Sequence, residues 1–498
     1  MPLKDINQQN FLTIVEQQSK NKWLVDHDNV ALLKLIKKNI LEIENIKSLV
    51  PRPARAGLAS DRLPRSVNNT LPKILLIESK PIDFIACFLA AIITKAPIFL
   101  GNPDWQPAEL KQVKESVKPD VIWHNNSSQQ ILGSKTSRET VLDGAIAIAT
   151  GGSSGKIRFA IHTIDTLTAS VRGFREYFAT PTINCCCILP LYHISGLIQL
   201  WRSLLSGGNL AIVSYENLKQ NITPTITPQN YFLSVVPTQL QFLLDCNPNW
   251  LGQFRTVLLG GAPSWKSLLE KARQHQIAIS TTYGMTETAS GISYLKPQDF
   301  LQGNCSSGQI LPHAKAVITN HHSQILEVNR VGTIKIESDS LYHGYYGKRN
   351  ESQKFIVTDD LGFIDTEGFL HIVGRNSRKI ITGGENVYPQ EVEAAILATG
   401  LVKDICVVGL KDNVWGQAVS ALFVPVDREV EITEIQQHLQ QQLSKYKQPK
   451  HWLATDSLLR DSKGKLNYSL LTTVAQELLA KKNRHKIIMS VSENSRLL

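Results

Sequence analysis

The chain has 498 residues, a length typical of two or three domains, and its 42% of hydrophobic residues can fill a large core. The formal net charge is +10, but the cations lie in short scattered clusters rather than on one face. That pattern favours anionic small molecules over nucleic acid as partners. The longest apolar stretch, 84–100, is interrupted by Lys95 and Pro97 and is too short to span a membrane.

The cysteines and the N-terminus indicate a reducing compartment. None of the seven cysteines has the spacing of a zinc site or a disulfide framework, and the run 185–187 predicts a buried strand. The first residues lack the apolar segment of a signal peptide. We therefore expect a cytoplasmic protein, and these features leave its oligomeric state open.

The hydrophobic pattern predicts a helix over 30–49, an exposed Pro- and Arg-rich loop over 51–70, and then strands alternating with helices to about residue 345. Such alternation is typical of α/β layers around a mainly parallel sheet. Short strands should follow at 332–338, 361–365 and 369–373.

The last part of the pattern predicts a small α/β unit whose final helix covers 469–481, with the last 17 residues frayed. The fold class expected is α/β. A large N-terminal domain, 1–377, would consist of layered α/β subdomains, and a small mobile α/β C-terminal domain would cover 378–498.

One loop has the composition of a phosphate-binding site. It lies between an apolar strand, 141–149, and a second β-type run, 157–162. Glycines let backbone N–H groups turn toward an anion, and hydroxyl groups add donors. The spacing is not that of a P-loop, so a plain Gly/Ser linker or hairpin is the alternative. The loop residues are Thr150, Gly151, Gly152, Ser153, Ser154, Gly155 and Lys156.

Further motifs follow this loop along the chain, at 258–263, 281–288, 358–362, 373–375, 383–389 and 463–465. Their residues and their order resemble the adenylate-forming superfamily, which includes acyl-CoA and aryl-CoA ligases, peptide-synthetase adenylation domains and beetle luciferases. The resemblance extends from about residue 72 to about residue 480.

The resemblance implies that ATP activates a carboxylic acid as an acyl-AMP and that coenzyme A then takes the acyl group. Both reactants of the first step are anions, so the site must supply cations and donors. The resemblance implies Lys465 as a mobile catalytic charge, Thr286 at the α-phosphate and Glu287 as the Mg²⁺ ligand. A surface lysine and a helix N-cap are the alternatives for these positions. Asp360 and Arg375 would bind the ribose, and the adenine slot would contain Gly260, Gly261, Ala262, Tyr283 and Gly284.

The acyl side is assigned to the motif at 190–197. The resemblance implies that the aromatic–His pair Tyr192–His193 borders the pocket and gates access to it, with Ser195 and Gly196 also binding the substrate; a core histidine is the alternative for His193. Arg202 lies two helical turns after Ser195 in an apolar run. It therefore needs an anionic partner, either a substrate carboxylate or a protein carboxylate.

The resemblance also implies that the path of the pantetheine arm of coenzyme A is lined by Gly383, Gly384 and Glu385. Two positions depart from the family pattern. Asp359 replaces a glycine and would bring an extra carboxylate near the phosphates unless it points away. Arg378 stands where many relatives have a hinge aspartate.

Within the superfamily, the motifs at 190–197, 257–263 and 283–289 most resemble those of 2-succinylbenzoate–CoA ligases of menaquinone or phylloquinone synthesis. A general fatty-acyl or 4-coumarate-type ligase is the alternative. A peptide-synthetase domain fits less well because no carrier segment follows 465, and no motif indicates luciferase-type oxygen chemistry. The expected partners are a small carboxylic acid, ATP and CoA, with no nucleic acid and no membrane span.

Overall fold

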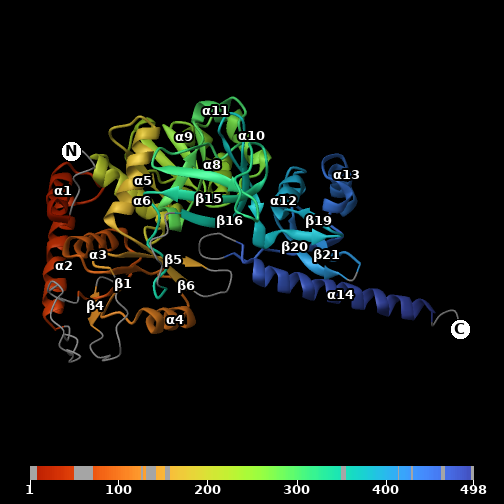
Figure 1. Ribbon diagram of the computed structural model, residues 1–498, viewed down its shortest axis with the longest axis horizontal. Coiled ribbons are helices and arrows are strands. Elements are labelled where there is room, and N and C mark those ends of the chain that lie inside the picture. The colour runs from red at the N-terminus through yellow and green to blue at the C-terminus, as the bar shows by residue number, and fades with distance from the viewer. Residues whose placement is uncertain are drawn as a thin grey trace.

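The computed structural model describes residues 8–49, 71–124, 127–130, 142–151, 157–348, 355–412, 414–427, 430–460 and 466–494. Four β-sheets organise these residues. Three sheets form a large N-terminal domain, and the fourth belongs to a small C-terminal domain beside it (Figure 1). The α/β fold class expected from the sequence is confirmed.

The first sheet has the strand order β4-β3-β1-β2-β5-β6. Its central strands are parallel, and the two outer strands, β4 and β6, pair antiparallel to their neighbours. The connecting helix α3 is almost entirely buried, because its small residues allow close packing between the sheet and the N-terminal helices. The bounds are β1 Ile74–Ile77, α3 Pro81–Thr94, β2 Ile98–Leu100, α4 Pro107–Val117, β3 Val121–His124, β4 Ser127–Gln130, β5 Ile146–Gly151 and β6 Ile157–His162.

The second sheet has the order β13-β12-β11-β10-β9-β7-β8, with a parallel core from β11 to β8. Its strand β7 contains the three consecutive cysteines, which are buried as predicted. The strands are β7 Asn184–Cys187, β8 Leu210–Ile212, β9 Tyr231–Val235, β10 Thr256–Leu259, β11 Ile279–Met285, β12 Ser290–Tyr294 and β13 Gln309–Ile310. The helices are α5 Ile164–Tyr177, α6 Ile194–Ser206, α7 Tyr215–Lys219, α8 Pro237–Cys246, α9 Pro248–Leu251, α10 Lys266–Gln274 and α11 Pro297–Leu301.

The third sheet is antiparallel throughout and consists of β14 Ala314–Thr319, β15 Gly332–Ser338, β16 Phe355–Ile364 and β17 Leu370–Arg375. Strand β16 begins earlier than the sequence pattern predicts. The Thr358–Asp360 motif therefore lies inside a strand, where side chains alternate between two faces.

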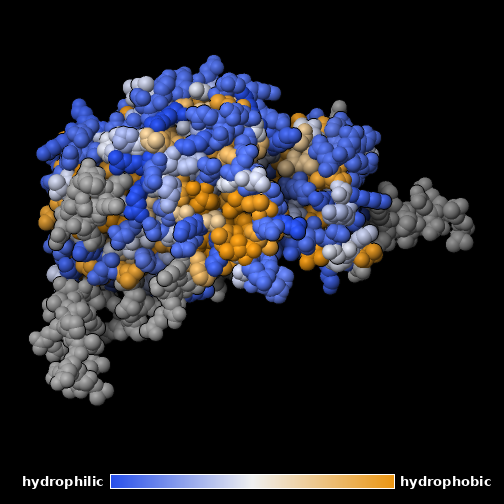
Figure 2. Space-filling view, turned by 45° about the horizontal axis from the view of Figure 1, so that its top comes forward, coloured by the Kyte–Doolittle hydropathy of each residue, from blue (hydrophilic) through white to orange (hydrophobic). Residues whose placement is uncertain are grey.

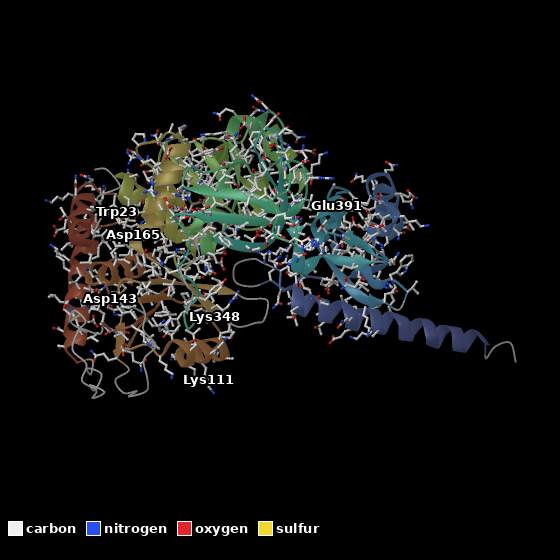
Figure 3. The ribbon with its side chains drawn as sticks, in the orientation of Figure 1. Trp23, Lys111, Asp143, Asp165, Lys348 and Glu391 are labelled. Atoms are coloured by element: carbon white, nitrogen blue, oxygen red, sulfur yellow. The ribbon has the colours of Figure 1, made fainter. Side chains whose placement is uncertain are left out.

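The fourth sheet has the order β19-β18-β21-β20, with β22 added beside β21. Its elements are β18 Ile380–Thr382, β19 Glu385–Val387, α12 Pro389–Leu397, β20 Val402–Asp412, β21 Gly416–Pro425, α13 Ile432–Gln442, β22 His451–Ala454 and α14 Tyr468–Asn494. Figure 3 labels Glu391 of α12 in this domain, where it pairs with Lys447 at 2.6 Å.

Helix α14 corrects one prediction. The sequence pattern ends the last helix at Lys481 and frays the final residues, whereas α14 continues to Asn494 and extends away from the C-terminal domain (Figure 1). The segment after Lys481 lacks an apolar stripe. However, it contains neither glycine nor proline, so no helix-breaking residue ends the helix before Asn494.

Two N-terminal helices, α1 Gln8–Lys20 and α2 Asn29–Leu49, pack on the large domain. The Phe11 ring of α1 stacks on Trp201 of α6 with centroids 5.2 Å apart, so α1 supports the helix that carries Arg202. Trp23, labelled in Figure 3, lies between α1 and α2 in the sequence and is fully buried.

Hydrophobic surface gathers near the centre of one face, while the rest of that face is mostly hydrophilic (Figure 2). A concentrated apolar area is typical of a binding surface. Across the described part of the chain, no helix has both the length and the apolar character to cross a bilayer.

Candidate active site

The candidate site begins where two parallel strands of the second sheet end. Gly260 and Gly261 follow β10, and Tyr283 lies near the end of the neighbouring β11, so the two motifs share one edge of the sheet. A side chain on Gly260 would place its Cβ 2.4 Å from Oγ1 of Thr282, and Gly261 has φ +81°. Both positions therefore favour glycine for reasons of space or backbone conformation.

Residues of three separate motifs meet at the Asp360 carboxylate. The Tyr283 hydroxyl donates to Oδ2 at 2.8 Å, and Arg375 Nε donates to Oδ1 at 3.0 Å. Asp360 and Arg375 face each other on β16 and β17, and Asp360 is buried. Burial and the neighbouring carboxylate raise the pKa of Tyr283, so its hydroxyl stays a donor. This cluster brings the ribose and adenine candidates together.

The Thr286–Thr288 turn (η3) follows β11 directly. The Tyr345 hydroxyl donates to the Glu287 carboxylate, and the Arg158 guanidinium lies 4.3 Å from the centre of the Tyr345 ring. Burial and Glu287 raise the pKa of Tyr345, so this hydroxyl also remains protonated.

The described residues contain no cluster of three or more histidine, cysteine or acidic side chains that would enclose a metal ion. Mg²⁺ does not need such a cluster, because one or two carboxylates and the phosphate oxygens of a nucleotide commonly hold it. Glu287, next to the nucleotide candidates, fits that donor set.

The glycine-rich loop joins antiparallel strands, so its base is a hairpin. Thr150 lies opposite Arg158, and Gly151 lies opposite Ile157. Thr150 is buried, and its hydroxyl has no hydrogen-bond partner among the described residues. The pairing with Arg158 places the base of the hairpin beside Tyr345 and Glu287. The remaining loop positions, Gly152, Ser153, Ser154, Gly155 and Lys156, lie outside the described residues.

On the acyl side, His193 is the N-cap residue of α6, and its ring packs edge-on against Tyr192 with centroids 4.5 Å apart. Gly196 in the first turn of α6 is needed for space, because a Cβ there would lie 2.2 Å from the carbonyl oxygen of Pro190. Ser195 is half-buried beside it.

Arg202 is 1% exposed, deep in α6. One guanidinium nitrogen donates to the Tyr294 hydroxyl at 2.8 Å, and the group lies 3.7 Å from the centre of the Phe174 ring. Its Nε has no hydrogen-bond partner among the described residues, and the part of the chain that is described provides no ion pair for it. The protein carboxylate that the sequence left open as a partner is therefore not found in this part of the chain.

The C-terminal candidates lie apart from this cluster. Gly383 and Gly384 form the exposed turn between β18 and β19, and Glu385, also exposed, begins β19. The Gly383 N–H donates to the Trp415 carbonyl at 2.9 Å. In the large domain, Ala262 of the predicted adenine slot follows β10 and is exposed. Lys465 lies outside the described residues.

The two departures from the family pattern have defined contacts. Asp359 accepts hydrogen bonds from the N–H of Ser377, at 3.0 Å, and from its hydroxyl. Its carboxylate thus points to the Asn376–Arg378 turn (η4), which is the alternative that the sequence left open, a side chain that points away from the phosphates. The Arg378 guanidinium lies 3.4 Å from the centre of the Tyr468 ring at the start of α14.

Sequence reasoning missed three residues around Glu287, namely Arg158, His162 and Tyr345. His162 ends the strand after the glycine-rich loop, and a histidine that closes a buried strand is a usable signal. Their distance in sequence from Glu287 hides the contacts.

Comparison with known proteins places this geometry in a family. Residues 49–346 match the family model described as AMP-binding enzyme, and residues 391–465 match that of the AMP-binding enzyme C-terminal domain. A 2-succinylbenzoate–CoA ligase of Enterococcus faecalis is 31% identical over 375 residues, which cover 74% of this chain and 76% of that protein.

Two solved structures of o-succinylbenzoate CoA synthetase from Bacillus subtilis have a similar fold. The complex with the acyl-adenylate intermediate gives a TM-score of 0.77 at 23% identity, covering 92% of this chain and 97% of the other. The complex with ATP and a magnesium ion gives 0.75 at 23% identity, covering 92% and 98%. At this level of identity, the likeness establishes the shared fold.

Proposed function

This chain belongs to the AMP-binding enzyme family, and on that premise we propose that it joins 2-succinylbenzoate to coenzyme A with ATP as the activating substrate. In the first step a carboxylate oxygen attacks the α-phosphorus, and pyrophosphate leaves. In the second step the CoA thiol attacks the acyl carbonyl, the proton is released, and AMP leaves. The related ligase from E. faecalis, covered over three quarters of its length, supports the choice of acid.

The nucleotide side of the proposal rests on the residues around Asp360. The Asp360 carboxylate, held by Tyr283 and Arg375, would accept the ribose hydroxyls. Gly260 and Gly261 would line the adenine slot together with Tyr283. Thr286 would donate to the α-phosphate. When bound, Mg²⁺ would neutralise phosphate charge, and Glu287 would hold it.

The single observation that carries the choice of substrate is Arg202. 2-Succinylbenzoate has two carboxylates. One is activated, and the other must be bound as an anion. A carboxylate buried without a cationic partner is costly, and so is a buried arginine without an anionic one. Among the described residues Arg202 has the Tyr294 hydroxyl and the Phe174 ring as neighbours but no anionic partner, and it lies on α6, whose N-cap residue is His193. An ion pair between the Arg202 guanidinium and the second carboxylate of the substrate would give both buried charges a partner.

The C-terminal domain would supply Lys465 for the first step and the turn at Gly383–Glu385 for the second, after a rotation near Arg378. The boundary at 377/378 stays a prediction. We also place the protein in the cytoplasm. All seven cysteines are free, with two of them exposed, which suits a reducing compartment.

The test is product analysis with a panel of acids. With ATP, Mg²⁺, CoA and 2-succinylbenzoate, AMP, pyrophosphate and a thioester should form in equal amounts. ADP in place of AMP would contradict the proposal, because attack would then be at the γ-phosphorus. Faster turnover of fatty acids or 4-coumarate would instead favour the general acyl- or aryl-CoA ligase.

A further inference from the structure

The Thr286–Thr288 turn is held from outside at each of its three carbonyl groups. His162 Nε2 lies 2.8 Å from the Thr286 oxygen, the Tyr342 N–H donates to the Glu287 oxygen at 2.9 Å, and the Ser340 hydroxyl donates to the Thr288 oxygen at 2.9 Å. Three external donors on three successive carbonyls fix the plane of each peptide and hence the direction of the side chains between them.

The backbone after the turn is strained. Ala289 has φ +51° and Ser290 has φ +97°, conformations that side-chain-bearing residues rarely adopt. Such strain persists only where the surroundings over-determine it, and it is concentrated at functional sites. Here the three hydrogen bonds from His162, Ser340 and Tyr342 hold the turn in this conformation.

His162 differs from the other two donors in its origin. Ser340 and Tyr342 come from one segment after β15, whereas His162 ends β6, the strand that leaves the glycine-rich loop. Its hydrogen bond therefore ties the loop hairpin to the turn that carries Glu287.

The chemistry of the ring fits this role. His162 is fully buried, and its Nε2 faces a carbonyl, which can only accept, so Nε2 carries the proton. Its Nδ1 lies 3.0 Å from the hydroxyl of Thr166, which orients the ring. Burial lowers the pKa of His162 to about 4, so the ring is neutral near pH 7 with its single N–H on the carbonyl.

We propose that His162 is a positioning residue. By holding the Thr286 carbonyl, its Nε2–H aims the Thr286 hydroxyl at the α-phosphate and the Glu287 carboxylate at Mg²⁺. His162 itself touches neither substrate nor metal. This inference rests on the proposed function, because it assigns the turn to the adenylation step.

The test uses two substitutions of similar length. In His162→Gln, the amide nitrogen stands as many bonds from Cα as Nε2 does, so the donor is kept. In His162→Met, a methyl group takes that place and the donor is lost. We expect His162→Met to lower kcat for acid-dependent pyrophosphate release by about 10- to 100-fold, since a small misplacement of reacting groups has effects of this size.

Two further readouts separate positioning from a general structural role. The Mg²⁺ concentration that gives half-maximal pyrophosphate release should rise at least about fivefold in His162→Met, because Glu287 is no longer aimed. Thioester formation from supplied acyl-AMP should change by less than about threefold, since it does not need the Mg²⁺–phosphate geometry. His162→Gln should stay within about threefold of the unmodified protein in all three measurements.

His371→Met is the matched control. His371 also lies on a strand, β17, and its Nε2 bonds a single acceptor, Asp365, at 2.7 Å. It lies near the start of β17, whereas Arg375 of the nucleotide cluster lies at the other end of the strand. Its loss should leave the Mg²⁺ requirement unchanged. If His162→Met does not fold, Thr166→Val tests the same point by removing the hydroxyl that orients the ring, and it should raise the Mg²⁺ requirement.

The outcomes are distinct. If the unmodified protein releases no pyrophosphate with any acid of the panel, the proposed function fails, whatever the variants do. If it does release pyrophosphate and His162→Met equals His162→Gln, or Thr166→Val leaves the Mg²⁺ requirement unchanged, the role of His162 is overturned.

Discussion

Replacing Arg202 with methionine should separate the two roles that a buried arginine can have here, ligand binding and structural pairing. Methionine keeps an unbranched apolar stem and removes the guanidinium. The changes in the free protein are opposed. The substitution removes the contacts with the Phe174 ring and the Tyr294 hydroxyl, which destabilises the folded protein. It also removes a buried cation that has no ion pair among the described residues, which stabilises the folded protein. We expect the free energy of unfolding to change by no more than about 1 kcal/mol.

The effect on the acid should be much larger. A buried carboxylate that loses its partner is destabilised by about 3–5 kcal/mol. The lower value corresponds to about a 160-fold loss of kcat/KM, since each 1.36 kcal/mol is a factor of ten. For 4-oxo-4-phenylbutanoate, which lacks only the ring carboxylate, the loss should stay below about threefold because no charge pair exists to be broken.

The assay is pyrophosphate release with both acids, together with urea unfolding of the free proteins. Arg255→Met is the control. Arg255 lies 5.0 Å from the centre of the Phe232 ring and donates to the Thr180 hydroxyl, contacts of the same kind outside the candidate site. Equal losses for both acids in Arg202→Met, or a drop of 3 kcal/mol or more in stability, would refute substrate binding and return Arg202 to a structural role.

Four other predictions follow from the same contacts. Lys465→Ala should abolish adenylation yet still convert supplied acyl-AMP to thioester, as separate assays of the two steps would measure; equal loss in both would contradict it. Asp360→Asn should raise KM for ATP about 30-fold, as expected when about 2 kcal/mol of charge-assisted hydrogen bonding is lost, and an unchanged KM would exclude a ribose role. Gly173→Ala should destabilise the protein by about 3 kcal/mol in urea unfolding, because its Cβ would lie 1.9 Å from Nδ1 of His313, whereas Gly252→Ala, with no atom nearer than 3.4 Å, should have little effect. Burial lowers the pKa of His313 from 6.5 to about 4. Between these two pH values the unfolded chain binds a proton at His313 and the folded protein does not, so the free energy of unfolding falls as the pH drops from 6.5 toward 4. When the pH is lowered from 7 to 5, the free energy of unfolding, measured in urea, should fall by about 2 kcal/mol less for His313→Gln than for the unmodified protein.

The parts of the site that sequence predicts best are those built from local backbone chemistry. Gly260 and Gly261 follow a strand whose neighbour carries Tyr283, and parallel strands bring their carboxyl ends to one edge. The ordered motifs then indicate which residues meet there. The contacts of Tyr283 and Arg375 with the Asp360 carboxylate agree with that expectation.

The parts that sequence misses are side-chain contacts between distant segments. His162 is 124 residues from Thr286, and Tyr345 is 58 residues from Glu287. No periodicity or spacing rule links such positions, since their meeting depends on how the first and second sheets pack. The extension of α14 is missed for a different reason: the residues after Lys481 have no apolar stripe to indicate a helix, yet they include no glycine or proline to end one.

Asp359 shows how one misplaced element boundary changes a conclusion about chemistry. The sequence pattern starts the strand at Leu361, which leaves Asp359 and Asp360 in a loop where both carboxylates could face the nucleotide. Strand β16 in fact begins at Phe355, and burial alternates along it, with Asp360 buried and Asp359 exposed. Adjacent residues of a strand point to opposite faces, so one carboxylate takes the site side and the other is directed to Ser377. The departure from the family's glycine therefore adds a contact between this strand and the Asn376–Arg378 turn, on the face of the strand opposite to Asp360.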